Sequence, residues 1–125
     1  MINSPFEKAR LFETILENLR VAVTYVDGDG VIVYANRAAH ERPSSVPRQA
    51  GTNIAQCHKE STNHTIARMF TEFKKGRRDP HHYVGSRLGY RELVTIIPVF
   101  DGDAFAGCFS PVSYTHLTLP TNREV

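Results

Sequence analysis

Runs of apolar residues near the start of the chain predict two strands followed by a short helix. The segment 21–36, VAVTYVDGDGVIVYAN, has two runs rich in β-branched and aromatic residues on either side of the turn Asp27–Gly30. Glycine accepts the positive φ of a tight hairpin turn, and aspartate can hydrogen-bond the turn backbone. Because both runs are apolar on both faces, we expect the hairpin to lie in a covered sheet. Asn36 is expected to cap a short helix over 37–41.

The segment before this hairpin predicts an amphipathic helix over about residues 5–19. Ser4 and Glu7 have the spacing of a capping box, and Pro5 stands in the first turn, where its missing N–H is tolerated. Five apolar residues share one helical stripe, namely Leu11, Phe12, Ile15, Leu16 and Leu19. The helix must bury this stripe somewhere, and packing on the protein's own sheet is the simplest interpretation.

A second amphipathic helix is predicted over residues 61–75, with Gly76 as its stop. Its apolar residues follow the spacing of one helical face: Ile66, Met69, Phe70 and Phe73. We expect this helix to lie across the sheet. Before it, prolines in 43–47 prevent a regular helix, and the segment 52–58 is expected to wrap around the domain. The cationic residues in 74–78 suit a helix C-terminus better than a phosphate site.

The last third of the chain predicts three more strands joined by tight turns. Residues 81–86 and 90–99 form one hairpin, and the turn at 101–103 leads into a final strand that starts at Ala104. Pro98 cannot donate a ladder hydrogen bond, so it is expected near a strand end or with its nitrogen facing away from a neighbour. Helices grouped between two sets of strands indicate an α+β fold with one antiparallel sheet.

Composition narrows the class of protein. With 125 residues the chain is long enough for one domain, and a formal net charge of +2 favours neither a nucleic-acid nor a membrane-surface partner. Two widely spaced cysteines, Cys57 and Cys108, suit a reducing cytoplasm better than a disulfide scaffold. No apolar run approaches the roughly 18 residues of a membrane span. We therefore expect a cytoplasmic domain.

Three pieces of the sequence, within about residues 13–109, resemble the PAS domain, and in particular a subfamily found beside hemerythrin-like regions in bacterial and archaeal proteins. These pieces are Val23-Thr24-Tyr25-Val26-Asp27 with Tyr34 and Asn36, Gly51-Thr52-Asn53-Ile54 with Cys57-His58 and Met69 to Gly76, and Ile97-Pro98-Val99 with Gly107. A proline commonly follows the Cys-His pair in that subfamily, whereas Lys59 and Glu60 follow it here.

The resemblance implies a five-stranded antiparallel sheet whose inner face, with the helices, encloses a ligand or partner site. It implies a role in sensing and signal relay, with an output domain elsewhere in the full-length protein. The residues expected to line the pocket are Tyr25, Ile54, Ile66, Phe70 and Ile97. If they close the interior completely, the alternative is a ligand-free interaction or dimerisation module.

The same resemblance offers a second interpretation of the N-terminal helix, because PAS flanking helices often dimerise or transmit a signal. The residues that would form a homodimer are Phe12, Ile15, Leu16 and Leu19. The expected organisation is therefore a flanking helix over 1–20, a PAS domain over 21–110 and a tail over 111–125.

The tail is expected to be foreign to the domain. Residues 112–121 resemble a translated sequencing adapter, so the natural chain is expected to continue beyond about Ser110. By the resemblance, the strand from Ala104 is central and pairs with strands 21–27 and 90–99. Residues after Pro111 have strand propensity, so we predict pairing to Tyr114 or Thr115 and disorder over Pro120–Val125.

The histidines lack zinc spacing, the Asp-Gly-Asp-Gly turn lacks the later ligands of a calcium loop, and no nucleophile with its base appears, so neither a metal site nor catalysis is expected. A haem would need an axial ligand, for which Cys57, His58 and Met69 are the candidates, although a structural role for the Cys57-His58 pair is the simpler interpretation. The flavin-binding branch is disfavoured because its cysteine motif does not occur around Cys57.

Overall fold

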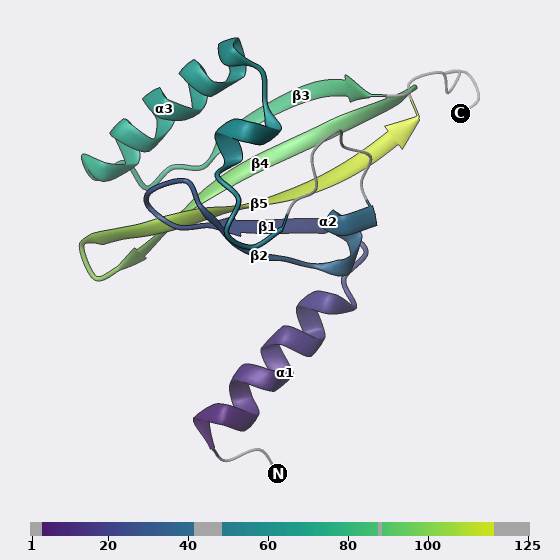
Figure 1. The fold of residues 1–125 in the computed structure, drawn as a ribbon, viewed down its shortest axis with the longest axis vertical. Helices are drawn as coiled ribbons and strands as arrows, with labels where there is room; N and C mark the ends of the chain where they lie inside the picture. Colours follow the sequence, from purple (N-terminus) through teal and green to yellow (C-terminus); the bar gives the residue numbers. More distant parts are fainter. Residues whose placement is uncertain (1–3, 42–48, 88, 117–125) are drawn as a thin grey trace.

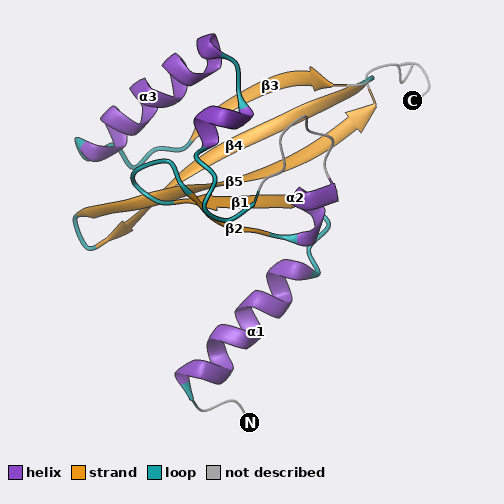
Figure 2. Ribbon diagram, viewed as in Figure 1, coloured by secondary structure: helices purple, strands orange, loops and turns teal. Residues whose placement is uncertain are grey.

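Five antiparallel strands form one sheet in the order β2-β1-β5-β4-β3 (Figures 1 and 2). The computed structural model describes residues 4–41, 49–87 and 89–116. The elements are α1 (Pro5–Glu17), β1 (Ala22–Val26), β2 (Ile32–Ala35), α2 (Arg37–Glu41), the 3₁₀ helix η1 (Ile54–Cys57), α3 (Glu60–Lys74), β3 (His81–Arg87), β4 (Tyr90–Asp101) and β5 (Ala104–His116). The predicted α+β class, the single sheet and the order of its elements are confirmed.

The last strand is central, as predicted. β5 lies between β1 and β4, with Phe109 opposite both Tyr25 and Ile97. Its pairing with β4 continues to His116, which is one or two residues beyond the predicted limit. The prediction of disorder over Pro120–Val125 lies outside the described residues.

The apolar face of α3 covers one face of the sheet, as its spacing predicts. Phe73 is fully buried, and Met69 and Phe70 are buried beside it. The Phe105 ring on β5 contacts the rings of Phe70 and Phe73, each at a centroid distance of 5.8 Å. Gly76 ends the helix at φ +109°, where a side chain would be strained. Burial of these aromatic rings is the main apolar contact between helix and sheet.

Element boundaries differ from the predictions by one or two residues. α1 ends at Glu17 rather than about residue 19, because Asn18 donates from its backbone N–H and its side chain to carbonyls of the last turn. β4 extends to Asp101 through Pro98. The pairing of β4 with β3 ends at Ile96, so β4 has no strand partner on that side at Pro98. This agrees with the prediction that the proline nitrogen faces away from a neighbouring strand.

Asn36 is fully buried, and its side chain makes four hydrogen bonds. Its Oδ1 accepts from the N–H groups of Val23 (2.9 Å) and Ala39 (3.0 Å), so it caps α2 as predicted. Its Nδ2 donates to the carbonyl oxygens of Leu16 (2.9 Å) and Val21 (3.0 Å). Every donor and acceptor position of the amide is therefore used. One side chain joins the end of α1, the strand β1 and the start of α2.

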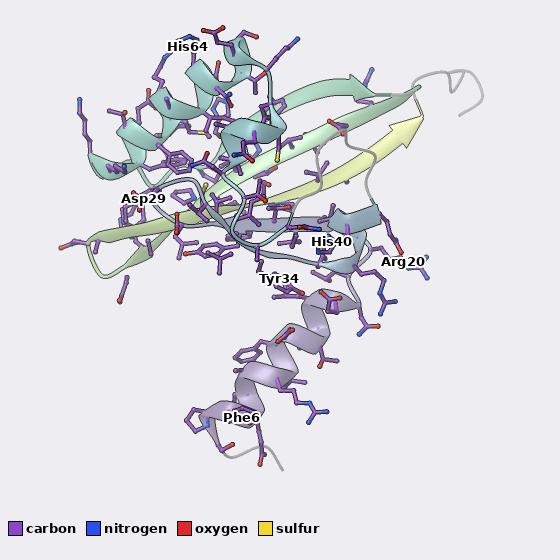
Figure 3. All side chains as sticks on the ribbon, viewed as in Figure 1. Phe6, Arg20, Asp29, Tyr34, His40 and His64 are labelled. Carbon is purple, nitrogen blue, oxygen red and sulfur yellow. The ribbon has the colours of Figure 1, made fainter. Side chains whose placement is uncertain are left out.

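α1 extends away from the sheet on the side opposite α3 (Figure 1). No residue of α1 is buried, and the side chains of Phe12 and Ile15 are 58% and 51% exposed. Phe6 lies at its outer end, and Tyr34 lies where the helix meets the sheet (Figure 3). The interpretation that the apolar stripe packs on the protein's own sheet is therefore wrong for its outer residues, because only Leu16 and Leu19 lie beside residues of the sheet. None of the helices in the described ranges has the length and apolar character needed to cross a membrane.

Two asparagine substitutions test the role of Asn36. Asn36→Asp keeps the acceptor for Val23 and Ala39 but places a carboxylate oxygen against the carbonyls of Leu16 and Val21. We expect it to lower the free energy of unfolding by roughly 2–4 kcal/mol, because buried partners lose their donor. Asn18→Asp, at an exposed helix end, is the control and should cost less than about 1 kcal/mol. Urea unfolding measures both, and equal losses would contradict the assignment.

A second pair of variants tests whether residues after Ser110 belong to the fold. Val112 is buried opposite Ala22 and Val94, whereas the next residue, Ser113, is exposed. Val112→Asn should lower the free energy of unfolding by about 2–4 kcal/mol, because it buries an amide among apolar side chains. Ser113→Asn should change it by less than about 0.5 kcal/mol. If thermal unfolding is the same for both variants, this part of β5 is not part of the core.

Candidate functional site

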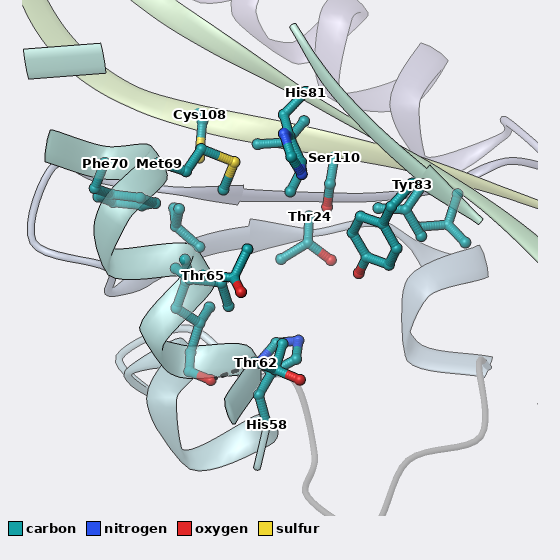
Figure 4. Close-up of a pocket in the computed structure, with 16 residues that line it drawn as sticks. Thr24, His58, Thr62, Thr65, Met69, Phe70, His81, Tyr83, Cys108 and Ser110 are labelled. Atoms are coloured by element: carbon teal, nitrogen blue, oxygen red, sulfur yellow. Dashed lines mark hydrogen bonds between the residues drawn. The ribbon is translucent and has the colours of Figure 1, made fainter. Parts of the chain in front are cut away.

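A cavity of about 90 Å³ lies between the sheet and the helical layer formed by η1 and α3 (Figure 4). Its apolar lining is Val26, Ile54, Ile66, Met69, Phe70, Val94, Ile96, Cys108 and Val112. Its polar lining is Thr24, His58, Thr62, Thr65, His81, Tyr83 and Ser110. The cavity on the inner face of the sheet therefore has a mainly apolar lining that also contains polar side chains.

Strand periodicity explains which residues the sheet contributes. Successive side chains of a strand point to opposite faces, so the residues that β1, β3, β4 and β5 contribute to the cavity are spaced two apart along each strand. The register places Thr24 opposite Ser110 and Val26 opposite Cys108. Tyr83 lies opposite Val94 on the neighbouring pair of strands. Hydroxyl groups thus lie next to apolar side chains across the sheet.

Hydrogen bonds hold His58 against the start of α3. Its Nδ1 lies 2.8 Å from the carbonyl oxygen of Ile54, and because a carbonyl only accepts, Nδ1 carries the hydrogen. The Asn63 side chain of α3 donates to the carbonyls of Ala55 (3.0 Å) and His58 (3.3 Å). The Asn53 side chain accepts from the N–H of Ala55 and caps η1. The imidazole therefore has a fixed orientation at one end of the cavity.

The two ends of the cavity differ in polarity. Met69, Phe70 and Cys108 gather at one end, and His58 and Thr62 lie at the other (Figure 4). Burial raises the pKa of the Cys108 thiol to about 12, so this thiol is neutral at ordinary pH. The end around Cys108 therefore disfavours negative charge.

Three of the five residues predicted to line the pocket do so, namely Ile54, Ile66 and Phe70. Tyr25 and Ile97 instead lie on the opposite face of the sheet, where both oppose Phe109. Their neighbours Thr24 and Ile96 take the inner positions. The prediction selected apolar residues without fixing the strand register, and a shift of one residue exchanges the faces.

Sequence reasoning did not single out the polar lining residues on the strands: Thr24, His81, Tyr83 and Ser110. Alternation from Val26, which is buried in the core, would have placed Thr24 on the same face. The positions on β3 and β5 depend on pairing between distant segments. No local signal in the sequence marks them.

Only two of the three predicted haem ligands reach the cavity. His58 and Met69 line the cavity, whereas Cys57 packs against the core cluster from η1 and does not line it. Ligand pockets usually begin at roughly 300 Å³, so a cavity of about 90 Å³ does not fit a haem. Within the described residues, no three histidine, cysteine or carboxylate side chains gather as metal ligands.

An apolar groove lies on the outer face of the sheet, beside the end of α1. Its lining is Leu16, Leu19, Val21, Val23, Tyr25, Tyr34, Phe109 and Pro111. The Tyr34 hydroxyl donates a hydrogen bond to the Glu17 carboxylate. Burial and this hydrogen bond raise the pKa of Tyr34, so the phenol keeps its proton. Two contacts, from Asn36 and from Tyr34, thus attach α1 to the sheet.

Solved structures with this fold come from several bacteria. The C-terminal domain of a Streptococcus mutans protein is 24% identical, with a TM-score of 0.68 and coverage of 84% of this chain and 83% of that chain. A sensory box sensor histidine kinase from Vibrio cholerae is 19% identical, with a TM-score of 0.61 and coverage of 90% and 95%. The PAS domain of Bordetella pertussis BvgS is 11% identical, with a TM-score of 0.64 and coverage of 94% and 92%.

The family model described as "PAS domain" matches residues 12–108, whereas no curated protein matches the sequence. The match spans both hairpins, the helical layer and all of the cavity lining except Ser110 and Val112, and it agrees with the fold shared with these structures. The subfamily found beside hemerythrin-like regions stays a prediction. On the strength of this match, the chain belongs to the PAS domain family.

Proposed function

We propose that this PAS domain is a sensory module that holds a small ligand in the inner cavity and relays its presence to α1. One connection carries the proposal. Thr24 lines the cavity, and its neighbour Val23 donates its backbone N–H to Asn36. The amide of Asn36 in turn holds the Leu16 carbonyl at the end of α1. A displacement of β1 by a bound ligand therefore changes the attachment of the helix.

A second contact supports the same relay. Tyr34 lies opposite Tyr25 in the β1–β2 pair and donates to Glu17 on α1. Both hydrogen bonds are made by the last turn of α1. No residue of this helix is buried, so little else fixes its position. A small rotation at this point is enlarged toward the far end of a helix of 13 residues. α1 is thus suited to report movement of the sheet.

The proposed output of α1 is pairing with a second copy of the chain. Its stripe leaves Phe12 and Ile15 about half exposed, and Leu19 is 40% exposed. Leaving apolar surface in water costs about 25 cal/mol per Å². A two-fold homodimer would bury the same stripe from both copies. An output domain in the full-length protein would then read the geometry of the helix pair.

The class of the solved neighbours supports sensing, since the Vibrio cholerae structure is of a sensory box sensor histidine kinase. Cys57 and Cys108 carry free thiols. This is in keeping with a reducing compartment, so we place the sensor in the cytoplasm. We assign no enzymatic step to it.

A second candidate function is a ligand-free interaction module. The observation that favours it is the cavity volume of about 90 Å³, which is well below that of common ligand pockets. In this case the cavity is a packing gap, and α1 with the outer groove is the whole functional surface.

Filling the cavity separates the two functions. Ser110→Leu places a larger side chain in the cavity from β5, while Ser113→Leu is the control at an exposed position of the same strand. If the cavity is a sensing site, Ser110→Leu changes amide hydrogen exchange in α1 by about threefold or more, and Ser113→Leu does not. A packing gap would give unchanged exchange in α1 for both variants, with at most a gain in stability for Ser110→Leu.

The dimer is tested by two glutamate substitutions on α1. Ile15→Glu places a charge on the apolar stripe, and Thr14→Glu places the same charge at an exposed position off the stripe. We expect Ile15→Glu to weaken dimerisation at least tenfold, about 1.4 kcal/mol, in sedimentation equilibrium. Thr14→Glu should retain the dimer, and both variants should keep the fold. A dimer that survives Ile15→Glu, or a wild-type monomer, would exclude this interface.

A further inference from the structure

We infer that the ligand of the inner cavity is a small uncharged molecule with one oxygen-bearing group, such as a short-chain alcohol or ketone. Its oxygen lies between the hydroxyls of Thr24 and Ser110, and its alkyl chain lies over Val26 and Cys108. The inference rests on the proposed sensing function and names the chemical class of the ligand. Four features lead to it: a pair of facing hydroxyls, an apolar pair beside them, charges that disfavour either kind of ion, and a small volume.

Two hydroxyls face each other across the central strands of the sheet. Thr24 on β1 lies directly opposite Ser110 on β5, and both residues line the cavity (Figure 4). Side chains at such opposite positions have Cβ atoms about 5 Å apart. Thr24 is only 8% exposed, yet in the described part of the chain neither its hydroxyl nor that of Ser110 has a hydrogen-bond partner. A buried hydroxyl costs free energy unless it is hydrogen-bonded, so this pair suits a ligand oxygen that accepts from both.

An apolar pair lies next to the hydroxyls on the same face of the same two strands. Val26 is opposite Cys108, two residues along from the hydroxyl pair, and both side chains are buried. Two residues of a strand span about 7 Å, which a chain of roughly four carbons and its oxygen can cover. Met69 and Phe70 of α3 pack in the same cluster and lie at this end of the cavity (Figure 4). One short amphiphile therefore reaches both the polar pair and the apolar pair.

A negative ligand is disfavoured by a buried carboxylate. Glu92 is 6% exposed and stands two positions before Val94, a residue of the cavity lining, on the same face of β4. Such positions are about 7 Å apart along a strand. An anion in the cavity would therefore lie near a second carboxylate, in surroundings where water does little to weaken their repulsion.

A positive ligand is disfavoured as well. Glu92 already interacts with another group of the protein, so its carboxylate is engaged. Within the described lining there is no aspartate, glutamate, lysine or arginine, and the imidazoles of His58 and His81 become positive when protonated. An ion of either sign would thus be buried without a partner, at a cost that an uncharged molecule avoids.

Size limits the ligand further. The cavity of about 90 Å³ is well below the volume of pockets for aromatic cofactors and leaves room for only a few non-hydrogen atoms. A second polar group on so short a molecule would fall at the apolar end, beside Cys108 and Met69. The ligand therefore has one oxygen-bearing group and a short alkyl chain.

The test compares four probes with the same four-carbon chain, by NMR titration of the full chain at constant ionic strength and neutral pH. Butan-1-ol is the uncharged probe with an oxygen, 1-chlorobutane is the uncharged probe without one, and butanoate and butylammonium are the two ions. We expect butan-1-ol to shift the backbone amide signals of Thr24 and Ser110. Its dissociation constant should be at least tenfold lower than that of either ion.

Two substitutions locate the oxygen. Thr24→Val and Ser110→Ala remove one hydroxyl each, and each should weaken binding of butan-1-ol about fivefold, while binding of 1-chlorobutane changes by less than about twofold. Ser113→Ala is the matched control, because Ser113 is the exposed residue after Val112 on β5. Circular dichroism verifies that each variant is folded. Equal weakening by Ser113→Ala, or unchanged binding of butan-1-ol in both hydroxyl variants, would overturn the inference.

The remaining outcomes separate the ligand class from the sensing function. If either ion binds as tightly as butan-1-ol, or if the hydroxyl variants weaken 1-chlorobutane equally, the cavity is a ligand site but the proposed class is wrong. If none of the four probes binds, the class is also wrong, and exchange in α1 of Ser110→Leu then decides the sensing function by itself. Binding of butan-1-ol with no change in α1 would support the ligand class and overturn the relay.

Discussion

The buried amide of Asn36 is the interaction on which the arrangement of the helices depends. It satisfies the N–H groups of Val23 and Ala39 and the carbonyls of Leu16 and Val21. These groups belong to β1, to the start of α2, to the last turn of α1 and to the chain between α1 and β1. A buried polar network of this kind is stable only when every member has a partner. The direction in which α1 leaves the sheet is therefore set by hydrogen bonds rather than by burial of its apolar stripe.

The sheet separates two environments with different roles. Its inner face carries the core, the cavity and α3, whereas its outer face carries an apolar groove and further exposed residues such as Val84 and Leu93. β5 lies in the centre and contributes to both faces, with Cys108 and Ser110 inside and Phe109 outside. Adjacent residues of β5 thus line the cavity on one face and the apolar groove on the other. A movement at the cavity could therefore reach the outer face through neighbouring residues of one strand.

Much of the fold followed from local patterns in the sequence. The hairpin around Asp27–Gly30, the α3 stripe and the stop at Gly76 are local signals, and each is present in the structure. The cap at Asn36 was predicted, but its bonds to Leu16 and Val21 were not, because they depend on where α1 ends in space.

The candidate site was predicted less completely. Ile66 and Phe70 come from a helix whose inner face is marked by periodicity, whereas Ile54 was expected only from the resemblance to PAS domains. On strands that are apolar on both faces, the pattern does not say which face is inside, so Tyr25 and Ile97 were placed on the wrong one. His81 and Ser110 reach the cavity through pairing of segments far apart in the sequence. Their position at the cavity becomes known only from the pairing of these strands in the folded structure.

The central claim is that occupancy of the cavity reaches α1 through Asn36. A double-mutant cycle tests it most directly, by measuring amide hydrogen exchange in α1 for wild type, Ser110→Leu, Asn36→Asp and the double variant under conditions where all four are folded. The account predicts that Ser110→Leu changes exchange in α1 when Asn36 is present and has no further effect in the Asn36→Asp background. An effect of equal size in both backgrounds would contradict it.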